Sequence, residues 1–370
     1  MPTWSLCMIV KDEEAVLERC LNSAAALADE IVIVDTGSSD ATKEIAGRFT
    51  DRIYDFPWKD DFAAARNFSF SLAEGEYVMW LDADDVLPED SLRLLLAKKA
   101  SLSGDVDVIM LPYETAFDET GKAVFSCERE RIIRNCGQCV WTGAVHEAIV
   151  PFGRILRLPA PIRHEKRGEG DRDRNLRIYE RLLKENRRLD ARQQYYYGRE
   201  LYFHEKYAKA EAVLERFLKE PDAWIVNRME AVRLLAYCRY RQGRDQEAFE
   251  TLLSGLGLGA PQPELCCDLG KHFLDREQYG AAAFWYQAAL AWSRSEAAGW
   301  TETDGGFAQL DCRGFLPCIQ LCVCYDRMGD HKRAEAYNER AGSYRPLSPY
   351  FLQNRRYFAH LRDAGSMAGD

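Results

Sequence analysis

Long hydrophobic runs are missing from this sequence. No uninterrupted apolar stretch approaches the ~18 residues that a membrane-spanning helix needs. The apolar stretch nearest the N-terminus, residues 6–10, is followed at once by Lys11 and three acidic residues, which is not the pattern of a secretion signal. We therefore expect a protein that is not integral to a membrane and that works in the cytoplasm.

Cysteine is too sparse for a disulfide scaffold. The chain has 12 cysteines among 370 residues, so reduced thiols are expected. Cys136 and Cys139 form a C-x-x-C pair, with Cys127 and His146 nearby in the sequence. A zinc site is one interpretation of this group, but no second C-x-x-C accompanies the first. Thiols packed as small apolar side chains are the simpler interpretation.

Positive charge is also in deficit. The chain has 49 Lys and Arg against 59 Asp and Glu, a formal net charge of −10. This balance argues against non-specific binding to nucleic acid, which needs a basic face. Residues 1–150 carry 14 basic and 28 acidic groups, a net of −14, whereas the rest of the chain carries a net of +4. Length and charge asymmetry together predict two domains with different roles.

Short apolar runs alternate with helical patterns over residues 1–110. Strands are predicted at residues 5–10, 31–34, 53–56 and 77–81, and helices at 12–27, 41–49 and 63–73. This order predicts an α/β fold with right-handed crossovers, a largely parallel sheet and ligands at the carboxyl ends of the strands. Two acidic loops, 35–40 and 82–85, follow predicted strands. Shorter strand candidates at 106–112, 131–134 and 155–158 are consistent with an extension of the sheet.

The C-terminal half contains a degenerate internal repeat. Its small and aromatic residues match the tetratricopeptide helix pair in three places, near Tyr197, Leu269 and Tyr325. The small residues expected between paired helices are Ala210, Ala248, Ala282 and Ala334, which are 38, 34 and 52 residues apart. The widest interval holds an insertion at 300–314. Stacked helix pairs would form a concave groove; an irregular helical bundle is the alternative.

These patterns divide the chain into four segments. We expect a Rossmann-type α/β domain with a mixed sheet at 1–168, a basic helical linker at 169–190, an all-α tetratricopeptide solenoid at 191–360 and a flexible tail at 361–370.

Two carboxylates one residue apart, Asp82 and Asp84, lie on a loop that leaves a predicted strand. Such a pair can bind a hard divalent cation through oxygen and leave open positions for substrate phosphates. The alternative is a helix start, with Asp85 or Asp90 as the cap and Pro88 in the first turn. The buried strand before the pair and the second acidic strand-end loop favour a metal site.

The segment Asp35-Thr36-Gly37-Ser38 has a different possible meaning, because an apolar run before D-T-G-S is also the signature of aspartic proteases. That mechanism needs two carboxylates that share a proton, usually one from each of two matching lobes. The sequence has no second D-[ST]-G, and residues 40–49 are predicted to be helical. We therefore discard the protease interpretation.

Four segments resemble glycosyltransferase family 2 in their order and spacing. They are residues 5–14 (SLCMIVKDEE), 31–42 (IVIVDTGSSDAT), 65–67 (ARN) and 75–85 (GEYVMWLDADD). The repeats and the segment 145–147 (VHE) resemble a bacterial subgroup that joins this domain to tetratricopeptide repeats. Peptide S-glycosyltransferases that modify bacteriocin precursors have a similar plan. The resemblance implies a GT-A-like fold that binds a nucleotide sugar.

The resemblance also implies roles for individual positions. Val10 falls where the family places a residue against the nucleobase, although that residue is often Thr. Asp35 matches the acid that recognises the uracil or ribose, and Arg66 matches a basic residue near the nucleotide. Asp82 and Asp84 match the D-x-D motif, with Asp84 the more direct ligand of a cation that is usually Mn²⁺ or Mg²⁺.

A basic stretch follows the α/β region. Residues 151–188 hold 12 Lys or Arg against 6 Asp or Glu. His164 is a candidate to complete the metal shell, and Lys166 and Arg167 are candidates to reach the diphosphate, where positive charge stabilises the departing phosphate. The alternative is a solvated basic linker into the repeats.

An inverting transfer needs a base to take the proton of the acceptor. Glu147 and His146 are the candidates, in the segment 141–147 (WTGAVHE). The family's base is an Asp or Glu on the acceptor side, which favours Glu147. Trp141 is either a platform for the acceptor or a core indole.

The predicted function is an inverting, metal-dependent transfer of a hexose from a UDP-sugar to an acceptor. A peptide Cys, Ser or Thr is the favoured acceptor, because a groove of helix pairs suits an extended peptide. A lipid-linked or cell-surface glycan is an alternative acceptor, and a catalytically inactive peptide-binding scaffold is an alternative of another class. Besides the donor and a peptide, a second copy of the chain is an expected partner.

Overall fold

The computed structural model describes residues 1–168, 170–292 and 308–363, and within them the chain forms two compact units. The first unit comprises residues 1–115 and 127–193, and the second begins at 194 and also takes in 116–126. The boundary expected at 168 therefore falls inside the first unit, which includes helix α5 (Arg174–Lys184) of the expected linker. Residues 361–363, expected in a flexible tail, are the end of helix α14 (Pro349–Asp363).

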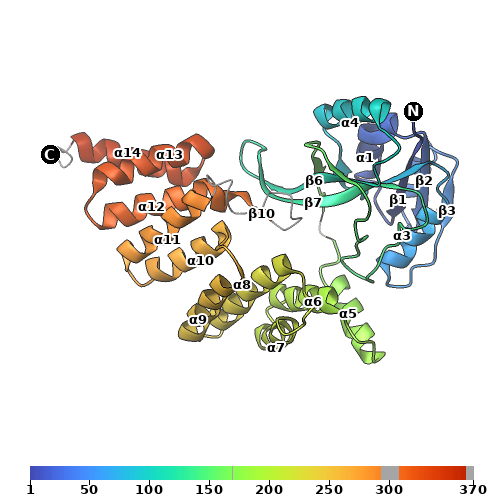
Figure 1. Ribbon diagram of the computed structural model, residues 1–370. Coiled ribbons are helices and arrows are strands. Elements are labelled where there is room, and N and C mark those ends of the chain that lie inside the picture. The colour runs from blue at the N-terminus through green and yellow to red at the C-terminus, as the bar shows by residue number, and fades with distance from the viewer. Residues whose placement is uncertain (169, 293–307, 364–370) are drawn as a thin grey trace. The chain divides into compact units, whose positions relative to one another are not determined.

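A mixed sheet forms the centre of the first unit (Figure 1). Its strands are β1 (Trp4–Val10), β2 (Glu30–Asp35), β3 (Ile53–Asp55), β4 (Tyr77–Trp80), β5 (Asp85–Val86), β6 (Val108–Phe117), β7 (Ala123–Arg134), β8 (Ile155–Arg157) and β9 (Ile162–His164). The order is β3-β2-β1-β4-β7-β6-β9-β5, with β8 beside β6. Strands β1 to β4 run parallel to one another, and β7 is antiparallel to β4. The predicted α/β fold is confirmed.

Helices connect the parallel strands. They are α1 (Leu17–Ala24), the 3₁₀ turn η1 (Ala25–Leu27), α2 (Thr42–Ala46), α3 (Phe62–Ser71) and α4 (Glu89–Ser101). The helix predicted from residue 12 begins only at Leu17. The reason lies in its first residues: Asp12 has a φ of 54°, and the N–H groups of Asp12 and Glu13 donate to the hydroxyls of Ser38 and Thr42 instead of entering a helix.

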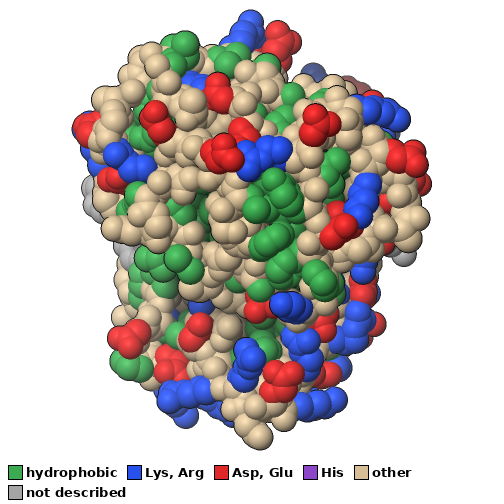
Figure 2. Space-filling model, turned by 90° about the vertical axis from the view of Figure 1, so that its right-hand side faces the viewer, with side chains coloured by type: hydrophobic (Ala, Val, Ile, Leu, Met, Phe, Trp, Pro, Cys, Tyr) green, Lys and Arg blue, Asp and Glu red, His purple; other side chains and the backbone are tan. Residues whose placement is uncertain are grey.

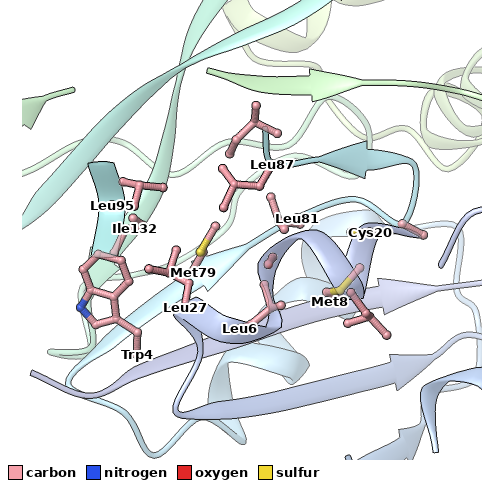
Figure 3. Close-up of a cluster of buried hydrophobic side chains, with 14 of the residues drawn as sticks. Trp4, Leu6, Met8, Cys20, Leu27, Met79, Leu81, Leu87, Leu95 and Ile132 are labelled. Atoms are coloured by element: carbon pink, nitrogen blue, oxygen red, sulfur yellow. The ribbon is translucent and has the colours of Figure 1, made fainter. Parts of the chain in front are cut away.

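The core of the first unit lies on both faces of the sheet, because successive strand residues point to opposite sides. Leu6 and Met8 of β1 pack on one face with α1 and α4 (Figure 3). Cys7, between them, faces the other side, where it joins Trp80 and Phe70 in a second cluster against α3. Burial on both faces explains why the sequences of these strands are continuous apolar runs and do not alternate between apolar and polar residues.

The outer edge of the sheet is a short strand. Strand β3 has three residues, and its Asp55 forms an ion pair with Lys43 of α2. Seen from the side that carries β3 (Figure 2), hydrophobic side chains gather in the middle of the surface with charged side chains around them. Short length and charge are both features that hinder the addition of a foreign strand to a sheet edge.

The second unit consists of antiparallel helix pairs. They are α6 (Ala191–Phe203) with α7 (Tyr207–Phe217), α8 (Ile225–Arg241) with α9 (Asp245–Gly255), α10 (Pro263–Leu274) with α11 (Tyr279–Trp292), and α12 (Phe315–Arg327) with α13 (His331–Tyr344), followed by α14. The four alanines predicted to pack between helices are all fully buried. Gly270 shows why a small residue is needed, because a Cβ there would lie 2.8 Å from the ring of Tyr286. The tetratricopeptide-like solenoid is confirmed.

Short elements complete the second unit. They are the 3₁₀ turns η2 (Leu256–Leu258) and η4 (Leu310–Arg313) and strand β10 (Ala308–Gln309). Strand β10 pairs with Phe125 and Ser126 of β7, and η4 packs against α10, α11 and α12. Most of the insertion expected at 300–314 lies outside the described residues. None of the helices in the described ranges is both long and apolar enough to cross a membrane.

Candidate functional site

A pocket of about 740 Å³ opens at the carboxyl ends of β1, β2 and β4. Its walls come from the last two residues of β1 and residues 11–13 after it, Thr36 after β2, residues 82–84 after β4, the start of α3, and the segments 145–147, 164–167 and 170–175. Because β1, β2 and β4 are parallel, the two acidic loops reach the same edge of the sheet, as the sequence predicted.

One rim of the pocket is a lattice of hydrogen bonds between the loops that follow β1 and β2. The Oδ1 of Asp12 accepts from the N–H of Ser39 at 2.7 Å, while the N–H of Asp12 donates to Ser38. Glu14 and Asp40 exchange bonds in the same way, with the N–H of Glu14 on Asp40 and the N–H of Ala41 on Glu14. Short polar side chains thus bind backbone groups of the opposite loop and hold the rim in one shape.

Asp35 is buried at the end of β2, with 1% of its surface exposed. Its Oδ1 accepts from the N–H groups of Gly37 and Ser38, each at 2.9 Å, and Gly37 adopts a φ of 110° that favours glycine. Its Oδ2 has no hydrogen-bond partner within the described chain. The D-T-G-S segment is therefore a turn that satisfies one carboxylate oxygen and leaves the other for a further donor.

Val10 contributes its backbone to the site. Its side chain is buried in the core, and its carbonyl accepts from the N–H and the hydroxyl of Thr36 at 2.9 and 3.1 Å. The position lines the pocket, and its side chain also belongs to the hydrophobic core cluster under α1.

Arg66 lines the pocket and is 5% exposed. Its Nη2 donates to Oδ1 of Asp82 at 2.6 Å, and its Nε donates to Oε1 of Glu147 at 2.5 Å. The guanidinium also lies 4.6 Å from the ring centroid of Trp80 and 4.9 Å from that of Trp141. The second turn of α3 thereby joins the loop after β4 to the segment that carries Glu147.

Both partners of the Arg66–Asp82 pair are ionised. Burial alone would raise the pKa of Asp82, but the positive charges of Arg66 and Arg131 and the hydrogen bond from Arg66 lower it to about 2. Burial would lower the pKa of Arg66, but Asp82 and Glu147 raise it further above its usual range. A pair of this kind, with the arginine buried and the aspartate partly exposed, is held by mutual compensation of charge.

An acidic cluster with the donor set of a cation site lies beside this pair. One ligand atom from each of Asp84, Asp85 and His164 lies within 4.8 Å of the others. The Nδ1 of His164 is 3.2 Å from Oδ1 of Asp84 and 3.5 Å from Oδ1 of Asp85. Antiparallel pairing of β5 with β9 places His164 directly opposite Asp85. Carboxylate and imidazole donors suit Mn²⁺ and, through the oxygens, Mg²⁺.

The pKa of His164 is governed by the two carboxylates beside it. Burial lowers its pKa, but hydrogen bonds to Asp84 and Asp85 outweigh burial and raise the pKa to about 10. The two carboxylates thus attract positive charge at this point of the pocket, which fits the donor set to a cation.

The composition of this cluster differs from the expectation. Asp82 was expected to share the cation with Asp84, but in the structure its Oδ1 is bound by Arg66, and Asp85 takes the third place. Asp85 is fully buried, accepts from Arg131 and Tyr113 at 2.9 Å each, and also accepts from the N–H of Asp82 at 3.0 Å. Through these bonds Asp85 anchors the loop 82–85 to Arg131 and Tyr113 in the protein interior.

Helix capping does not explain Asp85. The N-cap of α4 is Pro88, without a side-chain capping bond, so neither Asp85 nor Asp90 caps this helix. The signal for Asp85 in the sequence was the third acid of D-A-D-D, which is more than a D-x-D pair needs.

Glu147 and His146 line the pocket beside the start of α3, where the N–H of Phe62 donates to the carbonyl of Ala144 at 2.9 Å. His146 has a φ of 51°, and its carbonyl accepts from Nε of Arg192 at 3.2 Å. Trp141 is 2% exposed and packs edge-on against Phe70 and Trp80, so it is a core indole and not an acceptor platform.

Lys166 and Arg167 both line the pocket on the segment that follows His164. Glu165, which lies between His164 and Lys166, donates its N–H to the carbonyl of Asp84 at 2.9 Å. Its side chain forms an ion pair with Arg19 at 3.1 Å. This tie holds the basic segment beside the acidic loop, so the segment is part of the pocket wall and not a solvated linker.

Several charged lining residues were missed by sequence reasoning, and Glu13 and Arg174 are two of them. Burial and the nearby charges of Asp84 and Asp82 raise the pKa of Glu13 to about 7. Arg174, in the first turn of α5, lies over the ring of Phe62 at 4.7 Å. The sequence contains a signal that could have marked Glu13 as a site residue, because Glu13 is part of the K-D-E-E segment of the first motif. For Arg174 the only signal is the basic stretch around it.

The zinc interpretation of the cysteines is not supported. Across the described residues, the one cluster of His, Cys, Asp and Glu that could hold a metal is the Asp84–Asp85–His164 group. All 12 cysteines are free, and nine of them are buried.

Comparison with known proteins agrees with this geometry. The family model for glycosyl transferase family 2 matches residues 5–157. LpsC of Rhizobium meliloti, a lipopolysaccharide core biosynthesis glycosyltransferase, is 30% identical over 192 residues, which cover 50% of this chain and 67% of that protein. The chain belongs to glycosyltransferase family 2.

Two further relatives match larger shares of the chain. A TPR repeat-containing protein of Synechococcus elongatus is 30% identical over 307 residues, 77% of this chain and 65% of that protein. The glycosyltransferase SunS of Bacillus subtilis, derived from prophage SPbeta, is 28% identical over 224 residues, 55% of this chain and 50% of that protein. The chain thus spans between half and two thirds of the length of these relatives.

Most of the residues that the sequence proposed for the site line one pocket. Asp82, Asp84, Arg66, Glu147 and His164 line the same pocket, together with His146, Lys166, Arg167 and the backbone of Val10. Asp35 is buried just below, next to the lining residue Thr36.

Proposed function

We propose that this family 2 protein transfers a hexose, with inversion, from a UDP-sugar to a nucleophile on an acceptor, with the help of Mn²⁺ or Mg²⁺. The observation that carries the proposal is the meeting of opposite charges in one pocket. Asp84 and His164 offer ligands for a cation, and Lys166 and Arg167 line the same wall. A nucleoside diphosphate needs both, because its phosphates bind a cation and basic side chains together.

The nucleoside end of the donor would lie toward β2. The unpartnered Oδ2 of Asp35 is an acceptor for an N–H of uracil or a ribose hydroxyl. A buried carboxylate oxygen without a partner is costly, so binding of such a donor group would be favourable. The backbone at Val10 borders this end of the pocket.

The cation, when bound, would stabilise the negative charge that develops on the leaving diphosphate. Asp84 and His164 would hold it, with Asp85 behind them, and Lys166 or Arg167 would bind phosphate oxygens. Asp82 would act through Arg66, which fixes the position of its carboxylate.

Glu147 is the proposed base. As the acceptor atom bonds to the anomeric carbon, the bond to UDP breaks and the acceptor proton passes to the carboxylate of Glu147. The ion pair with Arg66 holds this carboxylate at the pocket wall. A peptide Cys would need less help than Ser or Thr, because the pKa of a thiol is nearer neutrality. His146 is the alternative base.

A peptide Cys, Ser or Thr is the favoured acceptor, supported by the helical repeats and by the resemblance to peptide S-glycosyltransferases. A glycan of the lipopolysaccharide type is the second candidate, and the likeness to LpsC favours it. The chain is proposed to work in the cytoplasm, and sedimentation would show whether it pairs with a second copy.

The decisive experiment follows UDP release and acceptor mass together. The protein is incubated with UDP-hexoses and Mn²⁺, or with EDTA, and with candidate peptides or a lipid-linked glycan. A gain of one hexose on a peptide, lost with EDTA, supports the proposal. A gain on the glycan alone overturns the peptide acceptor. Binding of UDP without turnover of any UDP-hexose would favour the inactive scaffold.

A further inference from the structure

An aromatic side chain that no motif accounts for stands at the pocket. Trp58 lies on the loop between β3 and α3, is half-buried and lines the pocket. Its indole Nε1 donates to Oδ1 of Asp60 at 2.7 Å, and its ring meets Phe62 edge-on, with centroids 4.8 Å apart and an angle of 70° between the planes. Two contacts of different kinds therefore fix the orientation of the indole.

The loop that carries Trp58 is fixed at both ends. At its start, the N–H of Phe56 donates to the carbonyl of Asp35 at 2.8 Å. Near its end, Arg181 of α5 binds Oδ2 of Asp60 at 3.0 Å and donates to the carbonyls of Lys59 and Asp60 at 3.2 Å. Asp60 itself has a φ of 53°, which is uncommon outside glycine. A buttressed loop of this kind presents its side chain in one position, as a binding platform requires.

Trp58 also differs from the other Phe and Trp side chains that line the pocket in its contacts with cations. Three Phe or Trp side chains line the pocket, and cations already cover two of them. Trp80 has Arg131, Arg66 and Arg129 at 3.8, 4.6 and 4.9 Å from its ring, and Phe62 has Arg174 at 4.7 Å. In the described chain no cation lies over Trp58.

The strand order indicates which part of a ligand Trp58 would meet. Strands β2 and β1 separate β3 from β4, so the ends of β3 and β4 lie about 14 Å apart at the usual strand spacing. The cation ligands follow β4, and a diphosphate must lie there. The Trp58 loop leaves β3 at the far side, next to Asp35, where the nucleoside end of the same molecule would reach.

We propose that Trp58 is the stacking platform for the nucleobase of the donor, and that Asp60 and Arg181 are positioning residues that hold it. The inference rests on the proposed nucleotide-sugar function and assigns its base contact. Stacking suits this place because a base has an aromatic face, and loss of one stacking aromatic typically weakens nucleotide binding by about ten- to a hundredfold.

Calorimetric titrations of the full chain with Mn²⁺ present would test the proposal. UDP is the probe, and inorganic pyrophosphate, which has no base, is the comparison ligand. In Trp58→Ala the Kd for UDP should rise at least tenfold while the Kd for pyrophosphate stays within twofold. Trp58→Phe should restore most of the UDP affinity, because it keeps a ring. Trp224→Ala, at an exposed position of the repeats, is the matched control and should bind UDP normally.

Asp60→Ala tests the positioning role. It should weaken UDP binding in the parent chain but add nothing in the Trp58→Ala background, since its effect passes through the indole. Equal loss of UDP and pyrophosphate binding in Trp58→Ala would instead indicate a general structural role and overturn the proposal. Unchanged UDP binding with an altered KM for sugar or acceptor would also overturn it. A parent chain that fails to bind UDP would contradict the proposed function itself, which separates the two failures.

Discussion

Nη2 of Arg66 lies 2.6 Å from Oδ1 of Asp82, and this partly buried pair ties helix α3 to the loop that carries the D-x-D motif. The same guanidinium reaches Glu147, so one cation compensates two carboxylates that line the pocket. Stability and site geometry therefore depend on the same side chain.

Arg66→Ala should destabilise the first unit strongly. Without the guanidinium, Glu147, whose side chain is 11% exposed, would be left as a poorly solvated charge, whereas water would partly screen Asp82, which is 34% exposed. Loss of one partner of a buried pair typically costs about 3–5 kcal/mol, and the exposure of Asp82 places the expected cost near the lower end. Urea unfolding measures the change. Arg48→Ala is the matched control, because its pair with Glu18 at 3.0 Å is solvent-exposed and should contribute less than ~1 kcal/mol. Equal effects of the two substitutions would contradict this account.

Asp84→Asn and His164→Ala should each weaken Mn²⁺ binding by at least about tenfold, because each removes a ligand from a small donor set. Direct calorimetric titration with Mn²⁺ measures the affinity. Asp90→Asn, in the exposed first turn of α4, should bind Mn²⁺ as the parent does. If Asp84→Asn retained full affinity, the cation would have to bind elsewhere.

Glu147→Gln should reduce kcat by roughly a hundredfold or more with a Ser or Thr acceptor, since removal of a general base typically costs 10²–10⁴. The loss should be smaller with a Cys acceptor, whose thiol ionises more readily. The Kd for UDP should not change, because glutamine keeps the shape of the side chain. A hydroxyl acceptor that reacts with Glu147→Gln at the parental rate would exclude Glu147 and leave His146 as the candidate base.

The fold was largely predictable because its signals are local. Runs of β-branched and apolar residues such as 31–34 indicate buried strands wherever they occur, and regularly spaced alanines mark helix pairs. The start of α1 was not predictable, because it depends on bonds from Asp12 and Glu13 to Ser38 and Thr42, which lie more than 25 residues further along the chain.

The site was predictable to the level of the loop but not of the side chain. The D-A-D-D segment marks an acidic loop, yet the choice between Asp82 and Asp85 as neighbour of the cation position depends on two distant contacts. Arg66 binds the carboxylate of Asp82, and the pairing of β5 with β9 places His164 opposite Asp85. Neither contact is local in sequence, so residue types and spacing alone do not reveal it.

Glu264 in the second unit is a buried carboxyl whose pKa is raised by burial and lowered by a nearby positive charge. It is 4% exposed, and its Oε1 accepts from the N–H of Gln309 at 3.0 Å. Burial raises its pKa, and the positive charge of Arg233 only partly offsets this. A carboxyl whose pKa is higher in the folded than in the unfolded chain favours folding when it is protonated. The ionised Glu264 therefore lowers the free energy of unfolding. This loss of stability is absent below the pKa of an unfolded glutamate, about 4.3, and develops as pH rises through the folded pKa.

Glu264→Gln should therefore stabilise the protein near pH 8 and have little effect near pH 4. Glutamine removes the buried charge and keeps an oxygen to accept from Gln309, so its advantage exists only where Glu264 would be ionised. Thermal unfolding of variant and parent at both pH values measures the difference. Glu205→Gln, at an exposed position of the same unit, should leave the Tm unchanged at either pH. A lower Tm for Glu264→Gln at pH 8 would mean that attraction to Arg233 outweighs burial, contrary to the direction of the pKa shift.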